Sequence, residues 1–122
     1  MTEASARSVS LAIPPKPDYI VLARLALSAI CRLTPLEPDD VADLKLAVSE
    51  VATERLTGTS EGAVRLDFEL EDDRLVVDLH AGPPPPDSED ALSRAIVEAT
   101  VDEVTYNDSS VRLVKRLPEP EE

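Results

Sequence analysis

The chain has 122 residues, a length at which proteins usually form one domain around a single hydrophobic core. Its composition, 43% hydrophobic and 30% charged residues, is that of a globular protein and does not fit an intrinsically disordered one. Aromatic residues make up only 2% and the net charge is −13, which leaves neither a stacking surface nor a basic patch for nucleic acid. We therefore expect no direct contact with nucleic acid.

The ends of the chain lack the features of a secreted or membrane protein. The N-terminal MTEASARSVS has no apolar stretch of signal-peptide length, and no segment approaches the roughly 20 apolar residues that span a bilayer. We therefore expect a cytoplasmic protein with no membrane partner. Cys31 lies in an Ala/Leu/Ile-rich run, which is typical of a buried small hydrophobe. Residues 1–7 and 118–122 are expected to be flexible tails around one domain, residues 8–117.

The first half of the domain contains one predicted strand and two predicted helices. Alternating apolar residues predict a strand over residues 8–13. Apolar residues at helical spacing predict a helix over residues 17–34. A second helix is predicted from Pro38, which suits a first turn, to Gly58, which suits the residue after a helix.

The second half contains a predicted hairpin, a third helix and two last strands. Period-2 patterns predict strands over residues 64–70 and 75–80, and later over 103–106 and 111–117. The third helix is predicted to begin near residues 87–88, with Leu92, Ala95, Ile96 and Ala99 as its apolar set. This order predicts an α+β fold in which one antiparallel or mixed sheet has its helices on one face.

The second predicted helix carries an acidic stripe. Asp43, Glu50 and Glu54 share one side, and the two glutamates are four residues apart. Paired carboxylates can act as a general base and a metal ligand, but acidic stripes on helices are mostly solvated faces. The spacing alone therefore favours a solvated face and leaves the chemical interpretation open.

His80 ends an apolar strand, at the kind of strand exit where binding residues often lie. It is the one histidine in the chain, so a structural or surface role is expected more often than a metal site. The four prolines at residues 83–86 form a rigid spacer more often than a docking segment. The chain has no glycine-rich motif for binding phosphate.

Residues 22–58 change the balance between these interpretations. Leu22-Ala23-Arg24 lies in the first helix, and AVSEVATE, residues 47–54, lies in the second. This region resembles the first two helices of the RsbW/SpoIIAB-type anti-sigma factor serine kinases, which belong to the histidine-kinase-like ATPases. The similarity continues more weakly through the later elements in the same order. It implies a two-layer α/β sandwich of the histidine-kinase-like ATPase type, with element order β-α-α-β-β-α-β-β.

The resemblance also implies roles for individual residues. Glu50 takes the place of the catalytic glutamate, which accepts the proton of the substrate serine. Glu54 replaces the magnesium-binding asparagine and adds a negative charge beside a triphosphate. In the family's D-x-G-x-G box, His80 replaces the adenine-binding aspartate, Gly82 matches the first glycine and Pro84 replaces the second.

The segment before the third helix departs furthest from the family. Only residues 83–90 intervene where the family has a flexible lid and a second glycine-rich box, so the ATP lid is expected to be shortened or absent. We therefore expect a degenerate nucleotide site at Glu54, His80 and Gly82, with no cofactor. If the family activity survives, Mg-ATP would be the cofactor, Glu50 the general base and Glu54 the metal ligand.

The resemblance predicts an anti-sigma-factor-like regulator that binds proteins in a partner-switching circuit. It implies two partners, a sigma factor and a STAS-domain anti-anti-sigma protein, and it places Arg24 at the partner-binding surface. It also implies a homodimer. Three alternatives remain open: an active serine/threonine kinase that phosphorylates a STAS protein, an unrelated small α/β protein-binding module, and a metal enzyme built on Glu50, Glu54 and His80.

Overall fold

A computed structural model describes residues 7–57, 62–82 and 91–118. The elements in these ranges are, in chain order, β1 (Arg7–Ile13), the 3₁₀ turn η1 (Pro17–Tyr19), α1 (Ile20–Cys31), α2 (Pro38–Thr57), β2 (Val64–Leu70), β3 (Arg74–His80), α3 (Ala91–Thr100), β4 (Glu103–Tyr106) and β5 (Ser110–Arg116). The predicted order of strands and helices is confirmed, and the predicted bounds of β2 and β4 are the observed ones.

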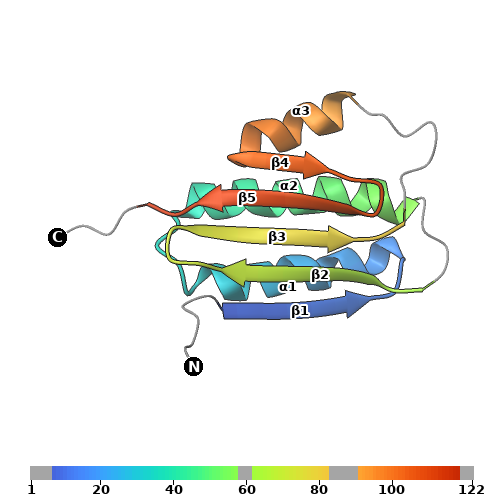
Figure 1. Ribbon diagram of the computed structural model, residues 1–122, viewed down its shortest axis with the longest axis horizontal. Helices are drawn as coiled ribbons and strands as arrows, with labels where there is room; N and C mark the ends of the chain where they lie inside the picture. Colours follow the sequence, from blue (N-terminus) through green and yellow to red (C-terminus); the bar gives the residue numbers. More distant parts are fainter. Residues whose placement is uncertain (1–6, 58–61, 83–90, 119–122) are drawn as a thin grey trace.

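The strands form one five-stranded sheet in the order β1-β2-β3-β5-β4, in which every neighbouring pair is antiparallel. Figure 1 shows α1, α2 and α3 together on one face of this sheet. Within the described ranges no helix covers the opposite face. The expected two-layer α+β architecture is therefore confirmed.

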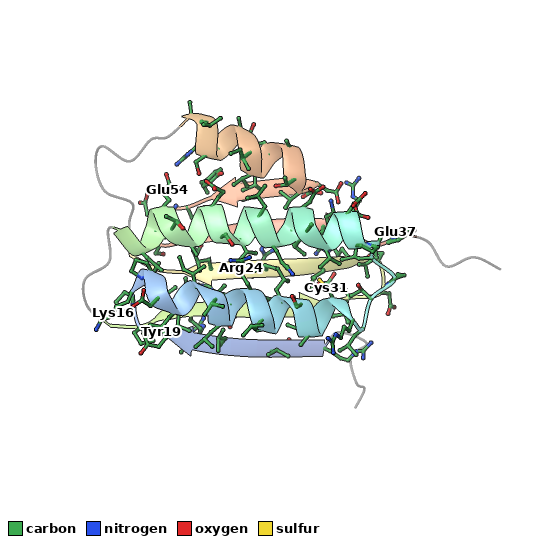
Figure 2. The ribbon with its side chains drawn as sticks, turned by 180° about the vertical axis from the view of Figure 1, so that it is seen from behind. Lys16, Tyr19, Arg24, Cys31, Glu37 and Glu54 are labelled. Carbon is green, nitrogen blue, oxygen red and sulfur yellow. The ribbon has the colours of Figure 1, made fainter. Side chains whose placement is uncertain are left out.

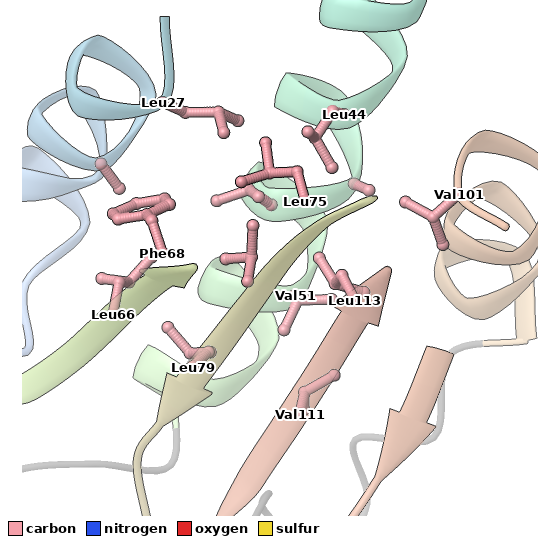
Figure 3. Packing of buried hydrophobic residues seen from close by; sticks show 14 of the residues in the cluster. Leu27, Leu44, Val51, Leu66, Phe68, Leu75, Leu79, Val101, Val111 and Leu113 are labelled. Atoms are coloured by element: carbon pink, nitrogen blue, oxygen red, sulfur yellow. The ribbon is translucent and has the colours of Figure 1, made fainter. Parts of the chain in front are cut away.

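The hydrophobic core lies between the sheet and the helices, because alternation along each strand turns every second side chain towards the helical layer. In β2 and β3 these positions hold Val64, Leu66, Phe68, Leu70, Leu75, Val77 and Leu79, all buried. Figure 3 shows Phe68 and Leu75 of the sheet lying close to Leu27 of α1 and Leu44 of α2. Burying each such leucine stabilises the fold by about 2 kcal/mol relative to leaving it in water.

The first helix is shorter than predicted at both ends. Its predicted first turn forms η1, so α1 begins at Ile20. At the other end the Thr34 hydroxyl donates to the Cys31 carbonyl at 2.7 Å and accepts from the Leu36 amide at 3.2 Å, which turns the chain out of the helix. Helix α2 begins at Pro38 as predicted, whereas the predicted role of Gly58 lies outside the described residues. None of the described helices has the length and apolarity needed to cross a membrane.

The predicted apolar set of α3 is wrong at three of its four positions, and only Ile96 is half-buried. Leu92 is 70% exposed, and Ala95 and Ala99 are also exposed, whereas the buried residues are Ser93, Val97 and Thr100. Two of these are polar, but each finds a hydrogen-bond acceptor: Thr100 donates to the Ile96 carbonyl at 2.9 Å, and Ser93 donates to a side chain of α2. Satisfied hydroxyl groups can therefore face the interior while leucine and alanine face solvent. The predicted start of this helix, near residues 87–88, lies outside the described residues.

Candidate functional site

Helix α2 lies between α1 and α3, so each of its flanks faces a different helix (Figure 2). The flank towards α3 carries Glu50 and Glu54, and both are half-buried. Interpreting these two carboxylates as part of a solvated face is therefore wrong, because α3 packs against the side of α2 that carries them. The residue spacing could not show this, since it does not tell which element covers a helix flank.

Glu50 makes a direct contact with α3. The Ser93 hydroxyl donates a hydrogen bond to Glu50 Oε1 at 2.9 Å, and Ser93 is 9% exposed. Ser93 lies in the first turn of α3 after residues 91 and 92, so the bond ties the start of this helix to the middle of α2. A serine hydroxyl of the chain itself therefore already occupies one oxygen of Glu50.

Glu54 lies one turn further along α2, where charged and aromatic groups of α3 and β4 gather. Its Oε2 atom is buried and has no hydrogen-bond partner among the described residues. Nearby, the Arg94 guanidinium lies 4.1 Å from the centre of the Tyr106 ring, a cation–π geometry. We call Glu50, Glu54, Ser93, Arg94 and Tyr106 the α2–α3 polar cluster.

The electrostatics of the cluster show that its members affect one another. Burial raises the pKa of the Tyr106 hydroxyl, the positive charge of Arg94 opposes this rise, and the negative charge of Glu54 adds to it. The Tyr106 hydroxyl is buried and, like Glu54 Oε2, has no hydrogen-bond partner in the part of the chain that the structure describes. Arg94 Nε is a third buried atom of the cluster without such a partner among the described residues. Because buried polar atoms are nearly always paired, the three together mark this cluster as a candidate site.

Arg55 anchors the end of α2. It is 1% exposed, and its guanidinium donates to the carbonyls of Asn107 at 2.8 Å, Asp108 at 3.0 Å and Gly82 at 3.5 Å. Burial lowers the pKa of Arg55, the negative charge of Glu54 opposes this change, and the positive charge of Arg94 adds to it. Arg55 therefore joins α2 to the β4–β5 turn and to the exit of β3. A charged residue at a core position of the helical pattern was the signal for this role.

His80 lies away from the cluster, on the opposite face of the sheet. On β3 the helix-facing residues include Val77 and Leu79, so His80 points the other way and its Nε2 lies 3.1 Å from Asp67 Oδ2. Partial burial alone would raise the pKa of Asp67, but the hydrogen bond from Ser10, at 2.7 Å, and the charge of Arg65 together lower it. The structure therefore does not bring His80 together with Glu50 and Glu54.

This separation corrects the metal-enzyme alternative, which needs all three side chains in one site. Among the residues that the structure describes, no group of three or more His, Cys, Asp or Glu side chains is arranged to hold a metal ion. Gly82 is described and accepts the hydrogen bond from Arg55, but Pro84, the rest of the proline run and the expected shortened lid lie outside the described residues. Arg24 is exposed on α1 and is not a member of the α2–α3 polar cluster.

The sequence pattern predicts site roles for Glu50 and Glu54 but not for Ser93, Arg94, Tyr106 or Arg55. Ser93 and Arg94 were overlooked because the leucine and alanines beside them suggested a different buried side for α3. Tyr106 was overlooked because a single aromatic residue in a short strand carries no chemical signal.

Comparison with known proteins gives one consistent group of relatives. The chain is 31% identical over 122 residues to the serine-protein kinase RsbW of Bacillus licheniformis, covering 89% of this chain and 72% of that protein. It is 28% identical over 131 residues to RsbW of Staphylococcus epidermidis, covering 82% of that protein. The match to RsbW of Listeria innocua is 33% identical over 73 residues, so the chain spans about half of that relative, 46% of its length. No family model matches the sequence.

A solved structure shows the same fold. It contains the RsbU and RsbW domains of Rv1364c from Mycobacterium tuberculosis and matches with a TM-score of 0.71 over 93% of this chain and 33% of that chain. Identity in this alignment is 14%, so the likeness concerns the arrangement of helices and strands and not the chemistry of the site.

Proposed function

Since the chain belongs to the family of RsbW serine-protein kinases, we propose that it is an anti-sigma-factor-like regulator acting by protein binding in a partner-switching circuit. Its proposed partners are a sigma factor, which it keeps from RNA polymerase, and a STAS-domain anti-anti-sigma protein that releases the sigma factor. Nucleotide binding and kinase activity are proposed to be lost. The observation that carries this last point is the hydrogen bond from Ser93 to Glu50.

Three features of the α2–α3 polar cluster and of the neighbouring strand β3 make this side of the sheet poorly suited to magnesium-bound ATP. Glu50 already accepts a hydrogen bond from Ser93 on one of the two oxygens that a general base would use. Glu54 adds a second carboxylate where the ligand itself is anionic. Leu79, and not His80, is the last β3 residue on the helix-facing side, so that side offers adenine an apolar group.

An active kinase is the alternative that one observation favours. The buried Glu54 Oε2 has no hydrogen-bond partner among the described residues, and a hard cation such as Mg²⁺ would satisfy a carboxylate oxygen in that position. Under this alternative Glu50 would act as the general base toward a STAS-protein serine. The two proposals differ in whether the chain binds nucleotide.

Calorimetry separates the proposed function from this alternative. The purified chain is titrated with ATP and with ADP, each with and without magnesium, at protein concentrations that detect sub-millimolar affinity. We expect no heat of binding in any of the four titrations. Magnesium-dependent binding that disappears in Glu54→Ala but persists in Glu98→Ala, an exposed acid of α3, would support the kinase.

Partner switching is tested by competition between proteins. A complex of the chain with a sigma factor is mixed with an unphosphorylated STAS protein in the absence of nucleotide, and released sigma factor is measured by size-exclusion chromatography. We expect release without ATP. Failure to form any sigma complex would contradict the anti-sigma role, which is proposed to operate in the cytoplasm.

We also propose a homodimer. Leu22, Leu25 and Leu33 of the α1 region are 41%, 61% and 60% exposed, and Val9 of the edge strand β1 is 48% exposed. Exposed apolar side chains gathered near one edge of a sheet suit burial against a second copy. Light scattering at tens of micromolar is expected to give the dimer mass, whereas a single species of monomer mass would contradict this proposal.

A further inference from the structure

Helix α3 carries its apolar side chains on the side that faces solvent. Leu92, Ala95 and Ala99 are exposed, and Ile96 is half-buried. These four residues follow the spacing i, i+3, i+4, i+7, so they lie along one side of the helix, and we call them the α3 apolar stripe. An amphipathic helix normally packs such a stripe against the core of its own domain, so α3 has the reverse orientation.

The polar residues of α3 fix this orientation. The Ser93 hydroxyl donates to Glu50 Oε1 at 2.9 Å, and the Arg94 guanidinium lies 4.1 Å from the centre of the Tyr106 ring. Thr100 is buried, and its hydroxyl donates to carbonyl groups of its own helix. Turning the helix to bury the apolar stripe would break the contacts with α2 and β4. The stripe therefore stays at the surface of the domain.

The stripe lies away from the surfaces that the proposed function uses. Figure 1 shows α3 beside β4, which forms one edge of the sheet, whereas β1 forms the other edge. The proposed homodimer uses α1 and β1, and the proposed partner contact uses Arg24 of α1. Neither contact would cover α3. An exposed apolar stripe that these contacts leave at the surface is typical of a further protein-binding site.

Acidic residues accompany the stripe. Glu98 of α3 is exposed, and Asp43 lies with Glu50 and Glu54 on the flank of α2 that faces α3. Among the described residues, no ion pair includes Glu98 or Asp43. The one basic residue of α3, Arg94, is engaged in its cation–π contact. The local charge is therefore negative, which attracts a cationic partner and repels nucleic acid and anionic lipid headgroups.

We propose that the α3 apolar stripe binds a basic amphipathic helix of a partner protein. Leu92 and Ile96 would pack between apolar side chains of that helix, while Ala95 and Ala99 are small enough to let the two helices approach closely. Lys and Arg residues beside the apolar side of the partner helix would reach the acidic residues of α2 and α3. A second copy of this chain fits less well, because its α3 carries the same acidic residues and like charges would face each other. The inference goes beyond the proposed function, since it assigns a second protein-binding surface.

A designed peptide tests the stripe directly. The probe is an 18-residue fluorescent peptide with leucines at helical spacing and lysines elsewhere, and its binding to the full chain is measured by fluorescence anisotropy. Because a chain with a net charge of −13 attracts any cationic peptide, a second peptide of the same composition with scattered leucines measures the non-specific part. We expect the helical peptide to bind about tenfold more tightly than the scattered one, or better.

Two substitutions in α3 locate the binding site. Ala95→Arg places bulk and positive charge in the stripe and should lower the affinity for the helical peptide about tenfold or more. Glu98→Lys reverses one charge beside the stripe and should lower it about threefold or more. Both positions are exposed, so both variants should fold like the original chain, which circular dichroism checks.

The matched control is Ala42→Arg, the same substitution at an exposed alanine on the other flank of α2. It changes the net charge equally and should weaken binding by less than about twofold, an amount that long-range repulsion supplies. Equal loss in Ala95→Arg and Ala42→Arg, equal binding of the two peptides, or no binding of either would overturn the proposal. Light scattering tests the second copy as occupant. If Ala95→Arg lowers the mass of the particle in solution, the stripe joins copies of this chain and the proposal is also overturned.

Discussion

The two flanks of α2 differ in how their charged groups are satisfied. The flank towards α3 carries Glu50 and Glu54, which are half-buried among Ser93, Arg94 and Tyr106 of the same chain. On the flank towards α1, Lys45 has no ion-pair partner among the described residues and lines an open groove. The polar groups on the α3 flank therefore make contacts within the chain, whereas Lys45 on the α1 flank has no ion-pair contact of this kind.

The difference separates two functions that the resemblance places on neighbouring surfaces. Catalysis needs the α3 flank open, because the glutamates must reach a nucleotide and a substrate hydroxyl. The proposed partner binding would use only the α1 side, where Arg24 lies exposed. A chain in which α3 covers the glutamates of α2, while the side towards α1 stays exposed, can lose kinase activity and still bind partner proteins. Four experiments test whether the two flanks differ in this way, and the one with the greatest expected change comes first.

The largest effect is expected at Arg55, which holds the closed flank to the sheet. Replacing Arg55 by Met should lower the free energy of unfolding by about 3 kcal/mol, because the buried guanidinium no longer donates to the carbonyls of Asn107 and Asp108 and the end of α2 loses its tie to the β4–β5 turn. Urea denaturation measures the change. Arg65→Met, at an exposed ion pair, is the control and should change stability by less than about 0.5 kcal/mol. Similar values for the two variants would show that the anchor carries little energy.

A loss of about 2 kcal/mol, roughly 30-fold in affinity, is expected for sigma-factor binding when Arg24 is replaced by Glu. The charge reversal places a carboxylate where the proposed partner would meet a guanidinium, and stability should stay unchanged because Arg24 is exposed. Biolayer interferometry with an immobilised sigma factor gives the dissociation constant. Arg7→Glu changes the net charge equally at an exposed position of β1, and equal weakening in both variants would remove Arg24 from the interface.

A smaller change is expected from Ser93→Ala on the closed flank. Losing the hydrogen bond to Glu50 should lower the free energy of unfolding by about 1 kcal/mol, since the carboxylate is left half-buried with one fewer donor. Ser10→Ala removes a comparable bond to Asp67 at an exposed position and should have a smaller effect. If Ser93→Ala also creates magnesium-dependent ATP binding, the closed flank is held shut mainly by this one bond.

The smallest effect concerns the ionisation of Tyr106. In a Tyr19→Phe background Tyr106 is the single tyrosine, and absorbance at high pH should report a pKa above the ordinary value of about 10. Because the folded state then keeps a proton that the unfolded state releases, stability should fall as the pH rises above that value. Adding Arg94→Met should raise the pKa further, since the charge of Arg94 lowers it. A midpoint unchanged by unfolding in urea would show that the cluster is open to water.

Much of the fold follows from local patterns in the sequence. The alternation from Val64 to Leu70 fixes both the strand and its buried side, because one face of β2 packs on helices and the other meets solvent. The start of α2 was recognisable because a proline at Pro38 is followed by acids that suit a helix N-terminus. These features depend only on neighbours in the chain.

The site was less predictable, because it depends on which surfaces meet in space. Ser93 is buried and Leu92 is exposed, an order that no hydrophobicity pattern gives, since the hydroxyl is satisfied by a glutamate 43 positions away in the sequence. The placement of His80 could have been foreseen. Leu75, Val77 and Leu79 alternate toward the core, so the next residue of an uninterrupted strand points to the opposite face.

The position of β5 has a consequence for how the chain reaches this structure. β5 comes last of the five strands in sequence, yet it lies between β3 and β4 in the sheet. While the chain is being synthesised, β3 can pair with β2 but leaves the backbone groups of its other edge, from Arg74 to His80, without a strand until residues 110–116 emerge. Unpaired apolar edges of this kind recruit other chains. We therefore expect ribosome-bound chains that end before β5 to be the species most prone to aggregate and most dependent on chaperones.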